Sequence, residues 1–121
     1  MTTQEVAARY YELACQGKFN EIHETFHDEN LVSREPEHGA PAGIETVTRG
    51  KAANKVKSDT HRAMIETMHS RDISEPLIAG NFFTTVLKRD VTYKGRPRVI
   101  SEEIAVIEVK NGKIVSETFF Y

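Results

Sequence analysis

Tryptophan is absent from this chain of 121 residues, and cysteine occurs only once, as Cys15. A lone cysteine cannot form an internal disulfide, so the sequence gives no sign of an oxidising compartment. Because Cys15 lies in a helical pattern among apolar neighbours, we expect it to be a small core residue rather than a nucleophile. Neither sign of charge is in large excess. The formal net charge of -2 provides no field that attracts nucleic acid or an anionic membrane, so neither is an expected partner.

Long apolar runs are missing as well. No run approaches the roughly 20 residues of a membrane-spanning helix, so the sequence predicts no membrane segment. The polar start, Met1-Thr2-Thr3-Gln4-Glu5, lacks the basic residues and the apolar run of a signal peptide, and we expect a cytoplasmic protein. The length fits one domain, residues 1–121. No glycine-rich phosphate loop and no Ser/His/Asp arrangement is recognisable.

Helical periodicity characterises the first part of the chain. Apolar residues spaced by three and four predict a helix over residues 3–16, with Thr3 as its N-cap and Gly17 as its stop. A second, shorter helix follows, with Phe26 on its apolar face. Residues 31–35 are expected to form a short strand that ends at the proline after it.

A loop rich in glycine and proline separates this strand from a third helix. The loop, residues 36–50, is long for a compact domain, so we expect it to cover or rim something. The third helix is predicted from Lys51 to about Met68, with an apolar stripe of Ala52, Val56, Ala63, Met64 and Met68. Its basic residues are expected to form a solvated face rather than a nucleic-acid site; they are Lys51, Lys55, Lys57 and Arg62.

The periodicity changes from helical to alternating after residue 70. Four strands rich in Thr, Val, Ile, Phe and Tyr are predicted, over residues 72–79, 82–93, 97–109 and 113–121. Asn111-Gly112 between the last two indicates a hairpin turn, because both residues accept a positive φ. Helices followed by a meander of strands predict an α+β domain, with the helices on one side of a mostly antiparallel sheet.

Three stretches of the sequence are similar to a known superfamily. The first runs from Ala8-Arg9-Tyr10-Tyr11-Glu12-Leu13 through Gly17-Lys18-Phe19 to His27-Asp28-Glu29; the second is Ser33-Arg34-Glu35-Pro36; the third runs from Asn111-Gly112-Lys113-Ile114-Val115 to Phe119-Phe120-Tyr121. In this order they resemble the nuclear transport factor 2-like superfamily, and its SnoaL-like members in particular. The resemblance implies three N-terminal helices packed on a strongly curved sheet that forms a cone with a mostly apolar internal pocket. Members include isomerases, polyketide cyclases, dehydratases and pure binding proteins.

The resemblance, combined with strand alternation, predicts which side chains enter this pocket. One face of each of the last three strands is assigned to it: Phe83, Thr85, Leu87 and Arg89; Glu103, Ala105, Ile107 and Val109; and Glu117, Phe119 and Tyr121. A register shift of one residue would put the opposite faces inside. The residues expected to contact a ligand are Phe26, His38, His61, Phe83, Leu87, Arg89, Ile107, Phe119 and Tyr121.

Four polar residues are the candidates for catalysis. Glu103 and Glu117 are expected among apolar side chains, where desolvation and mutual repulsion raise the pKa of at least one carboxyl to a range that suits a general acid or base. Glu35 occupies the place that the resemblance to ketosteroid isomerases gives to a catalytic carboxylate, near the pocket mouth. Tyr10 matches the isomerase tyrosine that donates a hydrogen bond to a developing oxyanion.

Each candidate also has a structural interpretation. Tyr10 lies on the apolar stripe of its helix and equally suits the core. Glu35 equally suits the flank of a loop, and Glu117 is also placed to pair with Arg89 in a buried salt bridge. Ala105 stands where the isomerases carry a second acid, which argues against steroid isomerase activity.

The histidines do not predict a metal centre. His23 and His27 are four residues apart, a spacing that places two ligands on one helical face, but no third ligand stands in the expected place. No cofactor is predicted either, because proton transfer by carboxylates needs none. His38 is expected near the pocket mouth, and His61 is either a pocket residue or a solvent-facing one.

Three functions are compatible with these features. The first is an enzyme of the cyclase, isomerase or hydratase type that acts on a small, apolar, carbonyl-bearing molecule. The second is a protein that binds such a ligand in the same pocket without turnover, and the third is an interaction module. In all three we expect a homodimer, because the outer face of the last strands is too apolar for a solvated sheet; it carries Ile104, Val106, Thr118 and Phe120.

Overall fold

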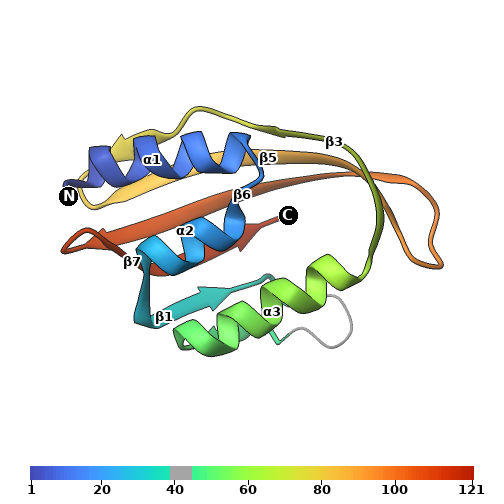
Figure 1. The fold of residues 1–121 in the computed structure, drawn as a ribbon, viewed down its shortest axis with the longest axis horizontal. Helices are drawn as coiled ribbons and strands as arrows, with labels where there is room; N and C mark the ends of the chain where they lie inside the picture. Colours follow the sequence, from blue (N-terminus) through green and yellow to red (C-terminus); the bar gives the residue numbers. More distant parts are fainter. Residues whose placement is uncertain (39–44) are drawn as a thin grey trace.

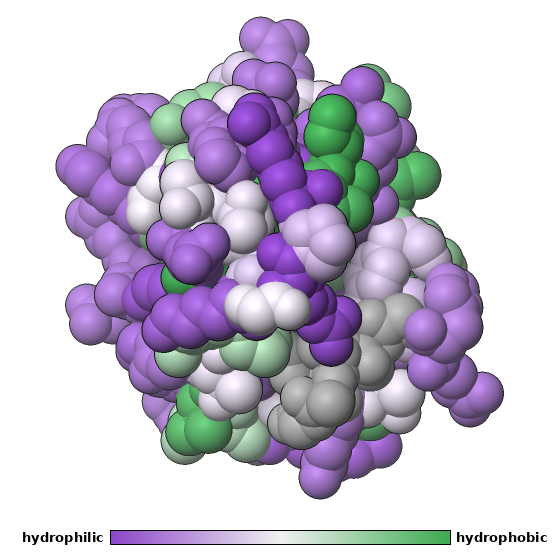
Figure 2. Space-filling view, turned by 90° about the vertical axis from the view of Figure 1, so that its right-hand side faces the viewer, coloured by the Kyte–Doolittle hydropathy of each residue, from purple (hydrophilic) through white to green (hydrophobic). Residues whose placement is uncertain are grey.

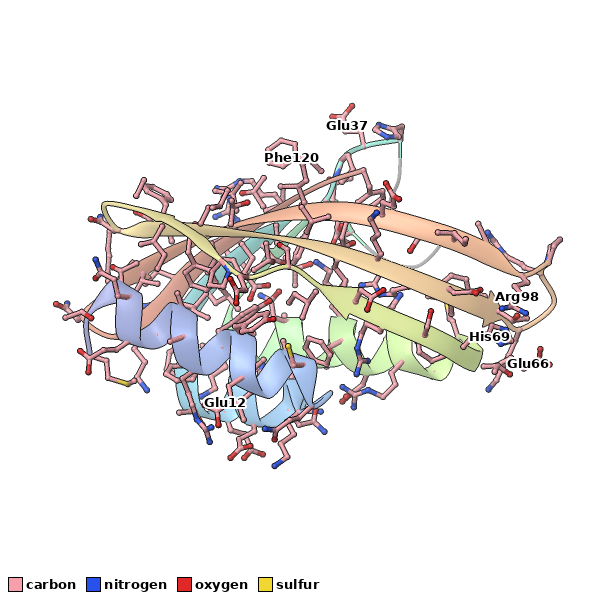
Figure 3. The ribbon with its side chains drawn as sticks, turned by 90° about the horizontal axis from the view of Figure 1, so that it is seen from above. Glu12, Glu37, Glu66, His69, Arg98 and Phe120 are labelled. Carbon is pink, nitrogen blue, oxygen red and sulfur yellow. The ribbon has the colours of Figure 1, made fainter. Side chains whose placement is uncertain are left out.

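In the described part of the chain, three helices cover one face of a sheet of seven strands (Figure 1). The computed structural model describes residues 1–38 and 45–121. The helices are α1 (Thr3–Cys15), α2 (Phe19–Phe26) and α3 (Lys51–Ala63). Seen from above, all three lie on the same side of the sheet (Figure 3), which confirms the predicted α+β arrangement. Within the described ranges, no helix is both long and apolar enough to cross a membrane.

The sheet is open and mostly antiparallel. Its strand order is β2-β1-β7-β6-β5-β3, β4 pairs with β5 as well, and β1 runs parallel to β7. The strands are β1 (His27–Arg34), β2 (Val47–Arg49), β3 (Ile65–Ile73), β4 (Leu77–Ala79), β5 (Phe82–Tyr93), β6 (Val99–Lys110) and β7 (Lys113–Phe120). Residues 99–103 of β6 pair with β5 beyond the end of β7. The end of the molecule where β5 and β6 meet at their turn has a mostly hydrophilic surface (Figure 2).

The register of the last three strands brings the predicted inner faces together. The cross-strand rows are Phe83–Ile107–Glu117, Thr85–Ala105–Phe119 and Leu87–Glu103. Phe83, Ala105 and Ile107 of these rows share one core with residues of α1 and α2, and Phe119 packs against it. The predicted faces are therefore the inner ones, and the shift of one residue that would have reversed them does not occur.

Local signals in the sequence fix the ends of α1 and the last hairpin. Asn111 and Gly112 both have positive φ, at 51° and 73°, which confirms the predicted two-residue turn. Gly17 follows α1 with a φ of 73°, as predicted for a helix stop. The predicted N-cap is wrong by one residue. Thr2 rather than Thr3 accepts from the backbone of Glu5, whose carboxylate accepts from the backbone of Thr2.

Helix α3 differs most from its predicted form. It ends at Ala63 rather than near Met68, because residues 65–73 pair with β5, and this long-range pairing overrides the helical pattern. The predicted apolar stripe is also wrong, since Val56 is 66% exposed while Asn54 is buried.

The inward face of α3 is polar instead. Asn54, Lys57 and His61 recur at helical spacing and contact strands of the sheet. The helix thus brings an amide, an ammonium and an imidazole to the inner side of the sheet, where the sequence predicts alanine, valine and methionine.

The ends of other strands also differ from their predicted positions, because strand pairing decides where they begin and end. β1 begins at His27 rather than at residue 31, since it runs beside β7 with an irregularity after His27. β2 lies within the predicted loop 36–50, and residues 39–44 of that loop lie outside the described residues. The predicted strand 72–79 is the end of β3, a break that contains Pro76, and then β4.

Cys15 is exposed rather than part of the core. The buried stripe of α1 ends with Leu13 and Ala14, and the next residue along the helix turns away from the sheet.

Asn54 ties α3 to the strands beneath it. Its side-chain amide donates to the carbonyls of Leu31, Thr48 and Gly50, and its carbonyl oxygen accepts from the Ser33 hydroxyl at 2.6 Å. Buried polar atoms need such partners, so this one side chain satisfies several backbone groups of β1 and β2.

We predict that Asn54→Ala lowers the free energy of unfolding by about 2–3 kcal/mol, because buried carbonyls and a hydroxyl lose their partners. Urea unfolding followed by circular dichroism measures the change. Val56→Ala on the exposed face of the same helix is the control, with an expected change below about 0.5 kcal/mol. Equal losses in the two variants would contradict the role given to Asn54.

Candidate functional site

A buried ion pair joins α3 to the end of β1. Lys57 Nζ lies 2.7 Å from Glu35 Oε1, and the two side chains are 15% and 11% exposed. The Tyr121 hydroxyl donates to the other carboxylate oxygen, Oε2, at 2.8 Å. Because both oxygens have partners, the Glu35 carboxylate is held in one orientation.

Lys57 is fixed by further contacts. Its ammonium donates to the Ser33 hydroxyl at 2.9 Å and lies 5.3 Å from the centre of the Phe119 ring. The sequence pattern assigns Lys57 to a solvated face, which is wrong. With Glu35, Ser33 and Phe119 around it, this lysine positions a carboxylate rather than acting as a nucleophile.

A second ion pair lies farther along the inner face. Arg89 Nη2 is 3.2 Å from Glu103 Oε1, and the Glu103 side chain is 14% exposed. Burial raises the pKa of Glu103, Arg89 opposes this rise, and the negative charge of Glu35 adds to it. The net result is a pKa above the ordinary value of a glutamate.

Glu117 pairs with His27 and not with Arg89, contrary to the alternative that the sequence left open. His27 Nε2 lies 2.9 Å from Glu117 Oε1, but its N–H is bent away from that oxygen, so the two groups are in contact without a linear hydrogen bond. Burial alone would raise the pKa of Glu117. His27, together with Lys57 at longer range, outweighs burial and holds this pKa below its ordinary value.

The two candidate tyrosines both keep their protons at neutral pH. Tyr10 is buried edge-to-face against Phe83, with ring centres 5.2 Å apart. Burial, with the charges of Glu117 and Glu103, raises the pKa of Tyr10. Burial and the hydrogen bond to Glu35 likewise raise the pKa of Tyr121. Each hydroxyl can therefore donate to an oxygen atom of a ligand.

His61 and His38 each contact a different tyrosine. His61 Nε2 lies 3.0 Å from the Tyr93 hydroxyl, and burial together with the charge of Arg89 lowers the pKa of His61 to about 4. His38 Nε2 donates to the Tyr121 carbonyl at 2.7 Å, which places it beside the end of β7. In the part of the chain that the structure describes, no group of three or more His, Cys, Asp or Glu side chains is arranged to hold a metal ion.

The apolar residues predicted to contact a ligand fall into two groups. Phe26 of α2, Phe83 and Ile107 lie in the core that α1 and α2 share with the sheet. Leu87 and Phe119 lie nearer the ion pairs, since Leu87 pairs with Glu103 across the strands and Phe119 faces Lys57. In the first group, Ile107 likewise pairs with Glu117 across the strands.

Two hollows among the described residues lie away from these ion pairs. One, of about 500 Å³, lies between the N-terminus and the β6–β7 turn; the other, of about 190 Å³, lies beside β4 and β5. Neither is lined by Glu35, Glu103 or Glu117. An internal pocket at the ion pairs therefore stays a prediction.

Sequence reasoning places Glu35, Glu103, Glu117 and Tyr121 on the inner side and misses Lys57, Ser33, Asn54 and His27. The two missed residues on α3, Asn54 and Lys57, do carry a sequence signal. Together with His61 they recur at the spacing of one helical face. Polar residues with that spacing usually face solvent, so the signal is recognisable only once the carboxylates opposite them are known.

Sequence comparison relates the whole chain to one family. The model of the SnoaL-like domain family matches residues 1–121. The crystal structure of a candidate SnoaL-like polyketide cyclase from Mesorhizobium loti is 34% identical, with a TM-score of 0.90 and 100% of each chain covered. A search of curated protein sequences found no match.

Two more distant structures share the fold. A nuclear transport factor 2-like protein of unknown function from Burkholderia pseudomallei has a TM-score of 0.79 at 16% identity, over 100% of this chain and 92% of its own. TerC, co-crystallised with polyporic acid, has a TM-score of 0.77 at 15% identity, over 98% of this chain and 90% of its own. They confirm the predicted nuclear transport factor 2-like fold, and at such identities they show the fold alone.

We predict that Lys57→Met lowers the free energy of unfolding by about 2–4 kcal/mol, because it leaves the buried Glu35 side chain without its cation. Urea unfolding at neutral pH measures the loss. Lys55→Met is the matched control two residues earlier. It removes an exposed partner of Asp59 and is expected to cost less than about 1 kcal/mol.

The double variant Lys57→Met, Glu35→Gln tests the pair itself. It is expected to recover part of the loss, since the unpaired carboxylate is gone as well. A Lys57 variant as stable as the Lys55 variant would rule out the ion pair as a structural element.

Proposed function

The chain belongs to the SnoaL-like domain family, and from that premise we propose that it binds a small, apolar, carbonyl-bearing molecule and moves a proton on it without a cofactor. The reaction would be of the isomerase, cyclase or hydratase type. The site is the inner face of the sheet around Glu103, Arg89 and Tyr121. TerC, which has the same fold, was crystallised with polyporic acid, and this supports a small-molecule site in such a fold.

Glu103 carries the proposal. Its carboxyl is buried on the inner face, and its pKa is raised although Arg89 lies beside it. A carboxylate with a raised pKa is a stronger base, and more of it accepts a proton near neutral pH. Both carboxylate oxygens of Glu35 have partners, and the pKa of Glu117 is lowered. These two carboxylates are therefore better suited to hold a negative charge in place than to remove a proton. Environments that separate the pKa values of neighbouring carboxyls divide acid and base roles within one site.

The proposed step is enolisation. Glu103 takes a proton from the carbon next to the ligand's carbonyl, and the electrons of the broken C–H bond form an enolate. The Tyr10 hydroxyl, close enough to Glu103 and Arg89 for their charges to act on it, donates to the enolate oxygen. If a double bond adjoins the enolate, Glu103 then returns its proton to the far carbon of that double bond, which gives an isomer. Alternatively, the enolate attacks a second carbonyl carbon and closes a ring, which leaves an alkoxide to be protonated.

Ligand entry is easiest at the rim of this face. The hydrogen bond from Tyr121 to Glu35 is exposed, whereas the Lys57–Glu35 pair is largely buried. We infer that an entering ligand displaces the Tyr121 hydroxyl and lays its apolar part against Leu87 and Phe119. The exposed lone cysteine is compatible with the reducing cytoplasm that the proposal assumes.

We predict that Glu103→Gln slows enolisation by about 100- to 10,000-fold, because the amide cannot accept the proton. Deuterium exchange into a panel of small apolar ketones, followed by NMR, measures the rate. Since a raised pKa keeps more Glu103 protonated, and the base must be ionised, the wild-type rate is expected to rise with pH through that raised pKa and to fall below it.

Glu102→Gln is the control, because Glu102 is the neighbouring carboxylate, exposed and paired with Lys88. It is expected to leave the exchange rate unchanged. Wild-type exchange in the Glu103 variant would exclude Glu103 as the base. Ketone binding without exchange in the wild-type chain would favour the binding protein without turnover.

The outer face of the sheet supports a second candidate function, that of a homodimeric interaction module. Val86, Ile104 and Phe120 form one cross-strand row and are all exposed, with Phe120 at 54%. Figure 3 shows Phe120 on the side of the sheet opposite the helices. A contiguous apolar row of this kind on a sheet face fits a second copy of the same chain.

We predict that the chain sediments at twice its mass of 13.7 kDa and that Ile104→Glu shifts it to the monomer, because a charge would be buried between two sheets. Analytical ultracentrifugation measures both species. Val56→Glu, which adds the same charge at an exposed apolar position of α3, is expected to leave the dimer intact. A wild-type monomer would exclude this interface.

A further inference from the structure

A chain of three titratable groups leads from α2 to the inner face of the sheet. His23 Nδ1 lies 2.8 Å from His27 Nδ1, and His27 Nε2 lies 2.9 Å from Glu117 Oε1. His23 keeps 8% of its surface exposed, while the side chains of His27 and Glu117 are 12% and 13% exposed. The three groups come from α2, β1 and β7, so the tertiary fold assembles them.

The Nδ1–Nδ1 contact restricts where the protons can be. Two ring nitrogens at 2.8 Å need one proton between them, since two protons would collide and none would leave two lone pairs opposed. With the carboxylate of Glu117 as an acceptor, neutral His27 carries its proton on Nε2 and accepts at Nδ1 from His23. The contact therefore couples the tautomers of the two rings.

Charged groups act on both ends of this chain. Burial lowers the pKa of His23, the charges of His27, Lys51 and Lys55 lower it further, and Glu117 raises it. Positive charge is thus unfavourable on His23, so a proton that arrives there is passed on rather than held. The charges of Asp59 and His23 also interact. On the inner side, the charge of Lys57 acts on Glu117, and the charge of Glu117 acts on Tyr10.

We propose that His23 and His27 relay protons between solvent and Glu117, so that Glu117 serves as the second proton-transfer group of the site. The inference rests on the proposed function, in which Glu103 removes a proton and a ring closure or hydration leaves a different atom to be protonated. His23 and His27 act through Glu117 and are positioning residues rather than catalytic ones.

The relay transfers one proton to Glu117 and leaves both histidines neutral. A solvent proton binds His23 Nε2, the Nδ1 proton of His23 passes to His27 Nδ1, and His27 becomes an imidazolium. Its Nε2 proton then passes to Glu117 Oε1, which requires a small rotation of the His27 ring to straighten the bent contact. One proton has entered at the surface, and one has arrived on Glu117.

The first experiment does not depend on catalytic activity. Imidazole ¹⁵N–¹H correlation spectra of the labelled protein are recorded from pH about 8 down to about 4, which spans the histidine range. At neutral pH we expect His27 protonated at Nε2 and His23 at Nδ1. On acidification, the first proton taken up is expected to make His27 doubly protonated while His23 changes to the Nε2–H tautomer. An isolated charge on His23, or neutral His27 with its proton on Nδ1, would overturn the relay.

The second experiment measures ring closure or hydration of the ketone panel in His23→Gln, since exchange at the carbon next to the carbonyl needs only Glu103. The amide can still donate to His27 Nδ1 but cannot pass a proton on, so product formation is expected to fall roughly tenfold and to recover when imidazole is added. The control is His69→Gln, which removes an exposed imidazole that hydrogen-bonds Thr92, and its rate is expected to match wild type.

The outcomes separate the relay from the proposed function. An unchanged rate in His23→Gln, or a loss that imidazole does not recover, would overturn the relay while leaving Glu103 as the base. If the wild-type chain exchanges no ketone, the proposed function fails, and the tautomer change alone decides whether the relay exists.

Discussion

Asn54 determines where the interior charges of this protein lie. Its hydrogen bonds to backbone groups of β1 and β2 and to the Ser33 hydroxyl fix both the position and the rotation of α3. With that rotation, Lys57 meets Glu35 and His61 meets Tyr93, while Val56 faces solvent. A different rotation would satisfy the apolar stripe of the helix, but it would leave buried carbonyls and a buried carboxylate without partners. The free energy gained by giving these buried polar groups hydrogen-bond partners therefore outweighs that of burying a few small apolar side chains.

The same constraint differentiates the carboxyl groups of the inner face. Each carboxyl has a cationic or basic partner from a different element: Lys57 of α3 for Glu35, Arg89 of β5 for Glu103 and His27 of β1 for Glu117. The balance of burial, partner and neighbouring charge differs at each position, so the pKa of Glu103 is raised and that of Glu117 is lowered. Chemically identical side chains thereby acquire different roles in the proposed proton transfer.

Much of the fold could be predicted because its signals are local. Asn111-Gly112 specifies its turn, Gly17 stops a helix, and two-residue alternation assigns the inner faces of β5, β6 and β7. The errors have different physical causes. Residues 65–68 continue a helical pattern but pair with β5, so a contact with a distant segment decided their structure. Cys15 has apolar neighbours but lies on the outward side of α1, so the direction of one side chain on the helix decided its exposure.

The sequence by itself determined the family, the α+β class, the order of the elements and the placement of Glu103 and Glu117 on the inner face of their strands. These follow from periodicity, turn chemistry and recurring motifs, which act over a few residues. Tertiary structure decided the partners of those carboxyls, the polar inward face of α3 and the contact of His23 with His27 and Glu117. The reason is that an ion pair or a shared proton depends on distances of about 3 Å between elements far apart in sequence, and no local pattern encodes such distances.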